Sequence, residues 1–221
     1  MTEAHQLLDY STWQSQGPQI ASQHSSGGSG TRSMLAWNDM DSSYTYSDIE
    51  GGIYDYAQFT SFCFPGIDVA SCPCGNPPAG SGQGCNNSSG TGGAQLYESG
   101  TSSLSADNVV FTSFGEKPTA TTVFLQGAGV STTGIVFGQG IRCAAGTLKR
   151  LYVKTASGGS ASAPVGGDPS VSARSAALGD TIAAGQNRYY LAYYRDPVVL
   201  GGCSASSTFN TTQTGALSWI P

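Results

Sequence analysis

The chain has 221 residues, of which 31 are glycine and only 10% are charged; this composition excludes a coiled coil or a charge-paired helix bundle and favours strands and turns. The net charge is −5 and the nine Lys and Arg form no basic stripe, which excludes the usual nucleic-acid-binding surfaces. No apolar run reaches the roughly 18 residues of a membrane-spanning helix, and 38% hydrophobic residues are too many for a disordered chain.

Charge divides the chain into two parts. Residues 1–68 carry eight acids and one base, whereas residues 69–221 carry six acids and eight bases. Such asymmetry is typical of two units of different origin. We therefore expect an acidic N-terminal extension at 1–62 and a separate domain at 63–221.

The extension begins with the one helical pattern of the chain, Thr2–Tyr10. Alternating apolar residues at 33–37 and 49–56, on either side of a polar turn, predict a β-hairpin. No basic and apolar signal segment opens the sequence. We expect the chain to be a piece of a longer protein.

The turn of this hairpin is rich in carboxylates. Asp39, Asp41 and Asp48 are candidate calcium ligands, because calcium binds carboxylate and carbonyl oxygens gathered on a loop. Asp39, Asp48 and Glu50 are the alternative catalytic set, that of a polysaccharide- or ester-active hydrolase with paired carboxylates. The third interpretation is that these acids are solvated. A Ser-His hydrolase is disfavoured, because the chain has only two histidines and no G-x-S-x-G motif.

The cysteines predict a disulfide framework. They are Cys63, Cys72, Cys74, Cys85, Cys143 and Cys203. An even number, with four in a stretch rich in Gly, Pro and Asn, is typical of secreted proteins. A zinc site made by the first four is the alternative, but Cys72-Pro73-Cys74 is tighter than the usual zinc-binding pair. We expect short bridges within the cluster and a long-range bridge from Cys143 to Cys203, with other connectivities open.

Seven strands are predicted beyond the cysteine cluster, at 94–99, 108–114, 121–126, 134–138, 147–154, 188–195 and 215–220. This pattern is typical of an all-β fold, a jelly-roll-like β-sandwich. Apolar residues on both faces of 108–114 predict a central strand. Residues 147–154 alternate, with Leu151 and Val153 inward, as in an edge strand. Ala156–Gly167 is rich in small residues and predicts an exposed loop.

The strand at 188–195 carries four tyrosines. Alternation places Tyr190 and Tyr194 on one face, and only one face can belong to the core. If their face is open, the rings could stack on the sugars of a polysaccharide or a cell-surface component. The candidate ligand-binding residues are Tyr190, Tyr194, Tyr152 and Trp219. The alternative is that loops cover both faces.

Short motifs run through the second part of the chain: CPCGN at 72–76, GCNNS at 84–88, SAD at 105–107, FLQG at 124–127, FGQGIRC at 137–143, GDP at 167–169 and YRDP at 194–197. Together they resemble the C-terminal Cys-rich domain of large, mostly uncharacterised secreted proteins of planctomycete-type and myxobacterial-type bacteria. The resemblance covers about 63–221 and implies secretion and surface attachment, without catalytic residues. Pro65-Gly66-Ile67-Asp68 stands where such domains often have a Gly-Asp-Gly loop, so a cation in that loop is not implied.

The preceding residues 21–57 resemble the last repeat of the propeller-like regions that often precede such domains. The sequence thus predicts a secreted, disulfide-bonded module with a binding, attachment or assembly role. Carbohydrate is the expected ligand, calcium is the expected ion if one is bound, and the hydrolase is the alternative. The oligomeric state is not specified.

Overall fold

The computed structural model describes residues 19–23, 31–40, 47–56, 59–200, 203 and 208–221, with side chains from residue 59 onward. The chain divides into two compact units, Met1–Tyr56 and Ala57–Pro221. The division falls a few residues before the expected boundary at 62.

The first unit contains a three-stranded antiparallel sheet. Its strands are β1 (Gln19–Gln23), β2 (Thr31–Met40) and β3 (Ser47–Tyr56), in the order β1-β2-β3. The predicted hairpin is β2 and β3, and its register pairs Thr31 with Tyr56. Strand β1 was not predicted from the sequence. The predicted helix at Thr2–Tyr10 lies outside the described residues.

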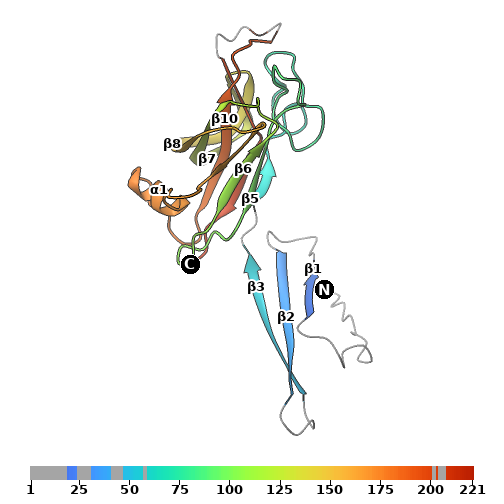
Figure 1. Cartoon of the computed structure of the whole chain (residues 1–221), viewed down its shortest axis with the longest axis vertical. Helices are drawn as coiled ribbons and strands as arrows, with labels where there is room; N and C mark the ends of the chain where they lie inside the picture. The colour runs from blue at the N-terminus through green and yellow to red at the C-terminus, as the bar shows by residue number, and fades with distance from the viewer. Residues whose placement is uncertain (1–18, 24–30, 41–46, 57–58, 201–202, 204–207) are drawn as a thin grey trace. The chain divides into compact units, whose positions relative to one another are not determined.

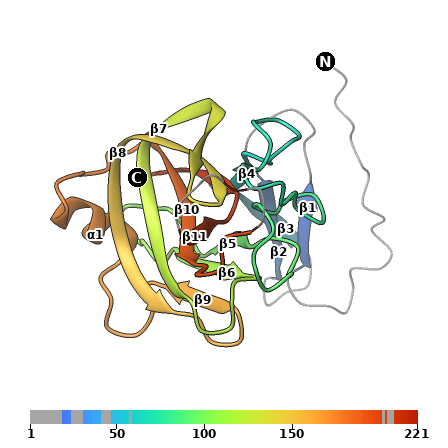
Figure 2. The ribbon, with the colours of Figure 1, turned by 90° about the horizontal axis from the view of Figure 1, so that it is seen from above.

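The second unit is a sandwich of two antiparallel sheets (Figures 1 and 2). The large sheet runs β4 (Thr60–Phe62), β12 (Thr214–Ser218), β10 (Asn187–Arg195), β7 (Thr121–Phe137) and β8 (Gly140–Thr155), with β11 (Phe209–Thr211) paired to β10. The small sheet consists of β5 (Gln95–Ser99), β6 (Val110–Phe114) and β9 (Ser160–Ala163). The short helix α1 (Val171–Ala177) lies against β8. The prediction of an all-β sandwich is confirmed.

The core lies between the two sheets. Side chains alternate between the two faces of each strand, and those that point inward form the core. Among them are Phe111 of β6, Phe124 of β7 and Leu217 of β12. The rings of Phe111 and Tyr190 lie 4.5 Å apart between their centroids. Burying each such side chain contributes roughly 1.5–3 kcal/mol, so this interface is the main source of stability in the unit.

Strands β7 and β8 form one long hairpin, and their bounds differ from those of the strands predicted from the sequence. The strands predicted at 121–126 and 134–138 are two ends of β7, whose ladder with β8 has three irregularities. One is a bulge, because the register passes from Phe124 opposite Tyr152 to Leu125 opposite Arg150.

This bulge corrects the predicted alternation of 147–154. Leu151 is the extra residue, so Leu151 and Tyr152 are both buried, while Val153 is 61% exposed rather than inward. The predicted position of the strand is confirmed, because β8 ends the large sheet. A prediction based on strict alternation of side chains does not account for a residue inserted by a bulge.

Two further predictions about strands are corrected in part. The strand predicted at 108–114 is central in the small sheet, but Phe114 on its outer face is 47% exposed. The stretch Ala156–Gly167, expected to be an exposed loop, contains β9. Its small side chains are required inside, since Ala163 is fully buried in the core.

All six cysteines form disulfides: Cys63–Cys143, Cys72–Cys85 and Cys74–Cys203. The disulfide framework is therefore confirmed, and these sulfurs do not form a zinc site. Of the short bridges expected within the cluster, only Cys72–Cys85 is found, because Cys63 and Cys74 bond cysteines outside it. The predicted bridge from Cys143 to Cys203 is wrong. Thr214 pairs with Phe62 across β12 and β4, and its hydroxyl accepts a hydrogen bond from the Cys143 amide. This register brings Cys63 beside Cys143.

No helix in the described ranges is long and apolar enough to cross a membrane.

Candidate functional site

The four aromatic side chains predicted to bind a ligand are buried. Tyr190, Tyr194, Tyr152 and Trp219 are all at most 5% exposed and belong to the core between the sheets. The Trp219 indole donates to the Tyr190 hydroxyl at 3.0 Å, and the Asn87 amide donates to the Tyr194 hydroxyl at 3.1 Å. Burial raises the pKa of both tyrosines. This corrects the prediction of an open stacking surface on these residues.

The polar residues of the short motifs hold loops together. The Asn76 side-chain amide donates to the carbonyls of Asn86 at 2.7 Å and Gln139 at 3.1 Å. The Gln139 amide donates to the carbonyls of Asp196 at 3.2 Å and Val198 at 3.1 Å. Buried backbone groups outside strands need such partners. These motifs therefore have a structural explanation.

The Asp68 loop is closed by its own backbone. The Asp68 carboxylate accepts hydrogen bonds from the amides of Cys63 at 3.1 Å and Phe64 at 2.5 Å. Within the ranges that the structure describes, no three His, Cys, Asp or Glu side chains gather where they could hold a metal ion.

The acidic hairpin remains a prediction. The β2–β3 register pairs Asp39 with Asp48 and Trp37 with Glu50. Asp41 lies outside the described residues, as do the side chains of the other three acids. The calcium and hydrolase predictions for these residues are thus not tested by the structure.

Ser88 has the contacts that most resemble those of a nucleophile. Its hydroxyl donates to the buried Asp196 carboxylate and accepts from Lys117 Nζ at 3.1 Å. The Ser88 amide also donates to Asp196 at 3.1 Å, and Lys117 reaches Ser89 at 3.0 Å. A nucleophile needs a base positioned to remove its proton, whereas here the amide and the hydroxyl both anchor the turn to Asp196. These contacts fasten the turn at 88–89 to the end of β10.

The outer face of the small sheet has a different character. We call it the β5–β6–β9 face, and it consists of Gln95, Tyr97, Ser99, Val110, Thr112, Phe114, Ser160 and Ser162. None of these residues is charged. Tyr97 is 49% exposed and Phe114 is 47% exposed, with ring centroids 5.7 Å apart in an edge-to-face arrangement. Around them lie hydroxyl and amide groups, and the Tyr97 hydroxyl donates to Gln95 Oε1 at 2.5 Å.

Strand β5 is held at the edge of the sheet by the side chain of Gln213, which lies between β11 and β12. The Leu96 amide donates to Gln213 Oε1 at 2.9 Å, and Gln213 Nε2 donates to the Leu96 carbonyl at 2.7 Å. The side chain therefore takes the place of a neighbouring strand. Because Leu96 is anchored in this way and faces inward, Tyr97 faces outward.

Sequence reasoning missed the β5–β6–β9 face. Phe114 was taken as part of a strand covered on both faces, and Tyr97 was not singled out. The available signal was the alternation within 94–99, where an inward Leu96 implies an outward Tyr97.

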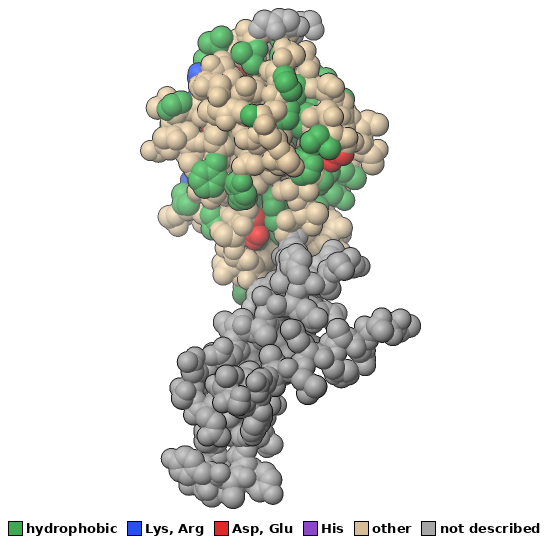
Figure 3. Space-filling model, turned by 90° about the vertical axis from the view of Figure 1, so that its right-hand side faces the viewer, with side chains coloured by type: hydrophobic (Ala, Val, Ile, Leu, Met, Phe, Trp, Pro, Cys, Tyr) green, Lys and Arg blue, Asp and Glu red, His purple; other side chains and the backbone are tan. Residues whose placement is uncertain are grey.

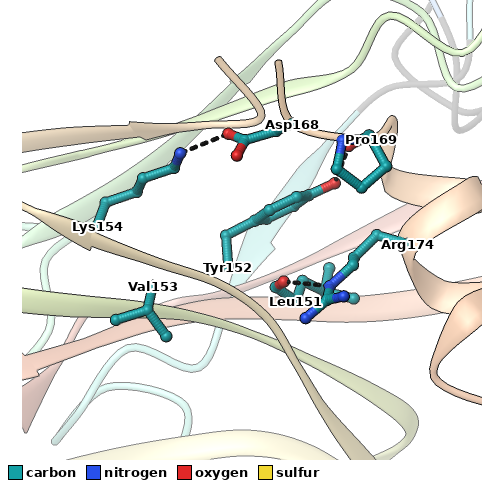
Figure 4. Close-up of a pocket in the computed structure, with 7 residues that line it drawn as sticks. All are labelled: Leu151, Tyr152, Val153, Lys154, Asp168, Pro169 and Arg174. Atoms are coloured by element: carbon teal, nitrogen blue, oxygen red, sulfur yellow. Dashed lines mark hydrogen bonds and ion pairs between the residues drawn. The ribbon is translucent and has the colours of Figure 1, made fainter. Parts of the chain in front are cut away.

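A pocket of about 240 Å³ lies between β8 and α1, and we call it the β8–α1 pocket (Figure 4). It is lined by Leu151, Tyr152, Val153, Lys154, Asp168, Pro169 and Arg174. Lys154 Nζ lies 2.5 Å from an Asp168 oxygen. The Tyr152 hydroxyl donates to the Pro169 carbonyl at 2.8 Å, and Arg174 Nε donates to the Leu151 carbonyl at 2.8 Å.

Two cationic side chains, Lys154 and Arg174, and one anionic side chain, Asp168, line the pocket. The hydrogen bond from Lys154, followed by one from the Val165 amide, lowers the pKa of Asp168, so this carboxyl is ionised at neutral pH. Desolvation by burial raises the pKa of Tyr152, which is thus a neutral hydrogen-bond donor. Sequence analysis had placed Tyr152 near a ligand, but helix α1 was not predicted and nothing indicated that Arg174 would lie beside β8.

The rest of the second unit offers few charges. Figure 3 shows one of its faces, on which most of the surface is neutral and hydrophobic side chains form separate clusters.

No protein-family model matches the chain, and neither the curated proteins nor the solved structures include a match. Function is therefore inferred from the surface of the second unit.

Proposed function

We propose that the second unit is a non-catalytic carbohydrate-binding module of a secreted protein, and that it binds polysaccharide on the β5–β6–β9 face. The observation that carries this proposal is the pair of half-exposed rings, Tyr97 and Phe114, within an uncharged surface of hydroxyl and amide groups.

Such a surface complements a neutral sugar chain. The C–H faces of sugar rings pack against aromatic rings, and their hydroxyls exchange hydrogen bonds with groups such as the side chains of Gln95, Thr112 and Ser162. Thr112 and Ser162 already bond one another at 3.0 Å, so their hydroxyls are ordered. Because no ion pair is involved, binding on this face is expected to be insensitive to salt.

The disulfides support an extracellular setting. Three bridges within about 140 residues fit a protein that folds in an oxidising compartment. A rigid module of this kind can attach a larger protein to an insoluble polysaccharide or to a cell surface, which is the role we propose.

Retention on insoluble polysaccharides and affinity electrophoresis in soluble glucans test the proposal. The purified chain is expected to be retained on at least one neutral polysaccharide, and Tyr97→Ala together with Phe114→Ala should weaken retention by about tenfold because two stacking surfaces are lost. The controls are Ile67→Ala and Val198→Ala, which remove side chains that are 68% and 56% exposed elsewhere.

Equal retention of the double variant and the wild type would reject the β5–β6–β9 face. Release of reducing ends during the assay would instead support the hydrolase alternative with its candidate carboxylates Asp39, Asp48 and Glu50.

A further inference from the structure

The β8–α1 pocket contains donors without partners. Arg174 uses Nε to bond the Leu151 carbonyl, and among the residues that the structure describes no acceptor lies within bonding distance of its two terminal nitrogens. The guanidinium lines the pocket together with Leu151 and Tyr152 (Figure 4). Two terminal nitrogens side by side match the two oxygens of a carboxylate.

Asp168 does not prevent an anion from binding. Its charge is compensated by Lys154, 2.5 Å away, and its second contact is the Val165 amide at 2.8 Å. The ion pair therefore contributes little net charge, and Arg174 leaves the pocket with a net positive charge. In the view of Figure 4 the Tyr152 ring lies between the ion pair and the guanidinium, and Arg174 makes no salt bridge to Asp168.

The remaining lining is apolar. Val153 is 61% exposed because the bulge at Leu151 turns it outward, and Pro169 lies beside the Tyr152 ring. Drug-sized ligands occupy pockets of roughly 300–1,000 Å³, so a pocket of about 240 Å³ suits a smaller body. A single sugar ring has that size, and its C–H groups can contact Val153.

We propose that the β8–α1 pocket binds a hexuronic acid residue of an acidic polysaccharide, with its carboxylate on the terminal nitrogens of Arg174 and its ring against Val153. The pocket shares no residue with the β5–β6–β9 face. The inference therefore goes beyond the proposed function, and either site can fail without the other.

Calorimetry and NMR titration of the full chain with monosaccharides test it. D-glucuronate and D-galacturonate are expected to bind, while D-glucose and the methyl ester of D-glucuronate, which lack the charge, should bind at least about tenfold more weakly. Added NaCl should weaken glucuronate binding, because the pocket is open to solvent. Equal affinity for glucuronate and its methyl ester would overturn the proposal.

Variants separate the pocket from the rest of the chain. Arg174→Gln should reduce glucuronate affinity by about tenfold or more. Lys149→Gln is the matched control, because Lys149 also contacts the end of α1, donating to the Leu178 carbonyl at 2.6 Å, but does not line the pocket. Ile67→Ala, which removes a side chain that is 68% exposed outside both proposed sites, should leave glucuronate binding unchanged. An Arg174→Gln protein that binds like the wild type would overturn the proposal.

Two variants of the Lys154–Asp168 ion pair test the proposal independently if Arg174→Gln folds poorly. Asp168→Asn should strengthen glucuronate binding by about threefold, because it removes a negative charge and releases Lys154, and Lys154→Gln should weaken it by a similar factor. The opposite order would contradict the charge arrangement. Tighter binding of a short peptide through its C-terminal carboxylate than of glucuronate would overturn the assignment to a sugar.

Discussion

Glu98 is an acidic side chain that faces the interior of the sandwich. It lies opposite Phe111 in the β5–β6 ladder, and its Oε1 is buried without a hydrogen-bond partner among the described atoms. Desolvation raises the pKa of this carboxyl from 4.5 to about 7. Between these two values the folded chain binds more protons than the unfolded chain, so the free energy of unfolding falls as the pH rises.

Glu98→Gln is expected to remove that part of the pH dependence. The wild type should lose about 1–2 kcal/mol of stability between pH 4.5 and pH 7.5, allowing for the partial exposure of the side chain, and the variant should lose less. Thermal unfolding at half-unit pH steps measures the difference between the two curves. Parallel curves would show that the Glu98 carboxyl ionises freely in the folded state.

At the residue scale, the sequence identified the aromatic residues but not their surroundings. Alternation placed Tyr190 and Tyr194 on one face, which is correct, and both are core residues. Whether a face is covered depends on residues remote in sequence, such as Asn87, which reaches the Tyr194 hydroxyl. No local pattern in 188–195 contains that information.

Among the elements, β5 depends on Gln213. This side chain is 2% exposed and bonds both the amide and the carbonyl of Leu96. Gln213→Ala is expected to destabilise the chain by about 2–4 kcal/mol, because it leaves two buried backbone groups unpaired. It should also weaken polysaccharide binding, since Tyr97 follows Leu96 on the same strand.

Urea unfolding measures the stability change, and the binding assay measures the second effect. Gln186→Ala is the control: this side chain is exposed, and its oxygen accepts from the Ala183 amide at 3.0 Å and from Arg188 at 3.1 Å. A Gln213→Ala loss no larger than that of the control would mean that β5 is held by its ladder with β6 alone.

The presence of most strands was predictable from the sequence. Their lengths, and which of their side chains point inward, were not. The predictions at 94–99, 188–195 and 215–220 succeed because each is a short run with aromatic or aliphatic residues bounded by turn residues. At 147–154 the phase fails because the bulge at Leu151 inserts a residue. At 160–163 small residues look like a loop, although Ala163 is small because it packs within the core.

For the whole molecule, the disulfide connectivity follows neither the sequence nor the strand order, because Cys63–Cys143 joins β4 and β8, which stand at opposite ends of the large sheet's order. The sequence indicated the framework, but the pairing depends on which segments the tertiary fold brings together. Cys63 follows β4, Cys143 lies on β8, and Thr214 of β12 contacts both regions. Since β4 and β8 are remote in sequence, no local spacing rule could select this bridge over Cys143–Cys203.

The bridges are expected to differ in their effect on stability. Cys63–Cys143 has a sequence separation of 80 and Cys72–Cys85 one of 13. A longer closed loop restricts the unfolded chain more, which corresponds to about 4.5 kcal/mol for the first bridge and about 3 kcal/mol for the second. The variant Cys63→Ala with Cys143→Ala should therefore lose more stability than Cys72→Ala with Cys85→Ala.

Guanidinium unfolding of the two double variants under non-reducing conditions measures this difference. Both variants delete two sulfurs and introduce two alanines, so the comparison isolates the position of the bridge. Cys63, Cys143 and Cys85 are fully buried, whereas Cys72 is half-buried and packs against the same hydrophobic cluster. Equal destabilisation, or a larger loss for the short bridge, would mean that the sulfurs act mainly through local packing around Ile141 rather than through the unfolded chain.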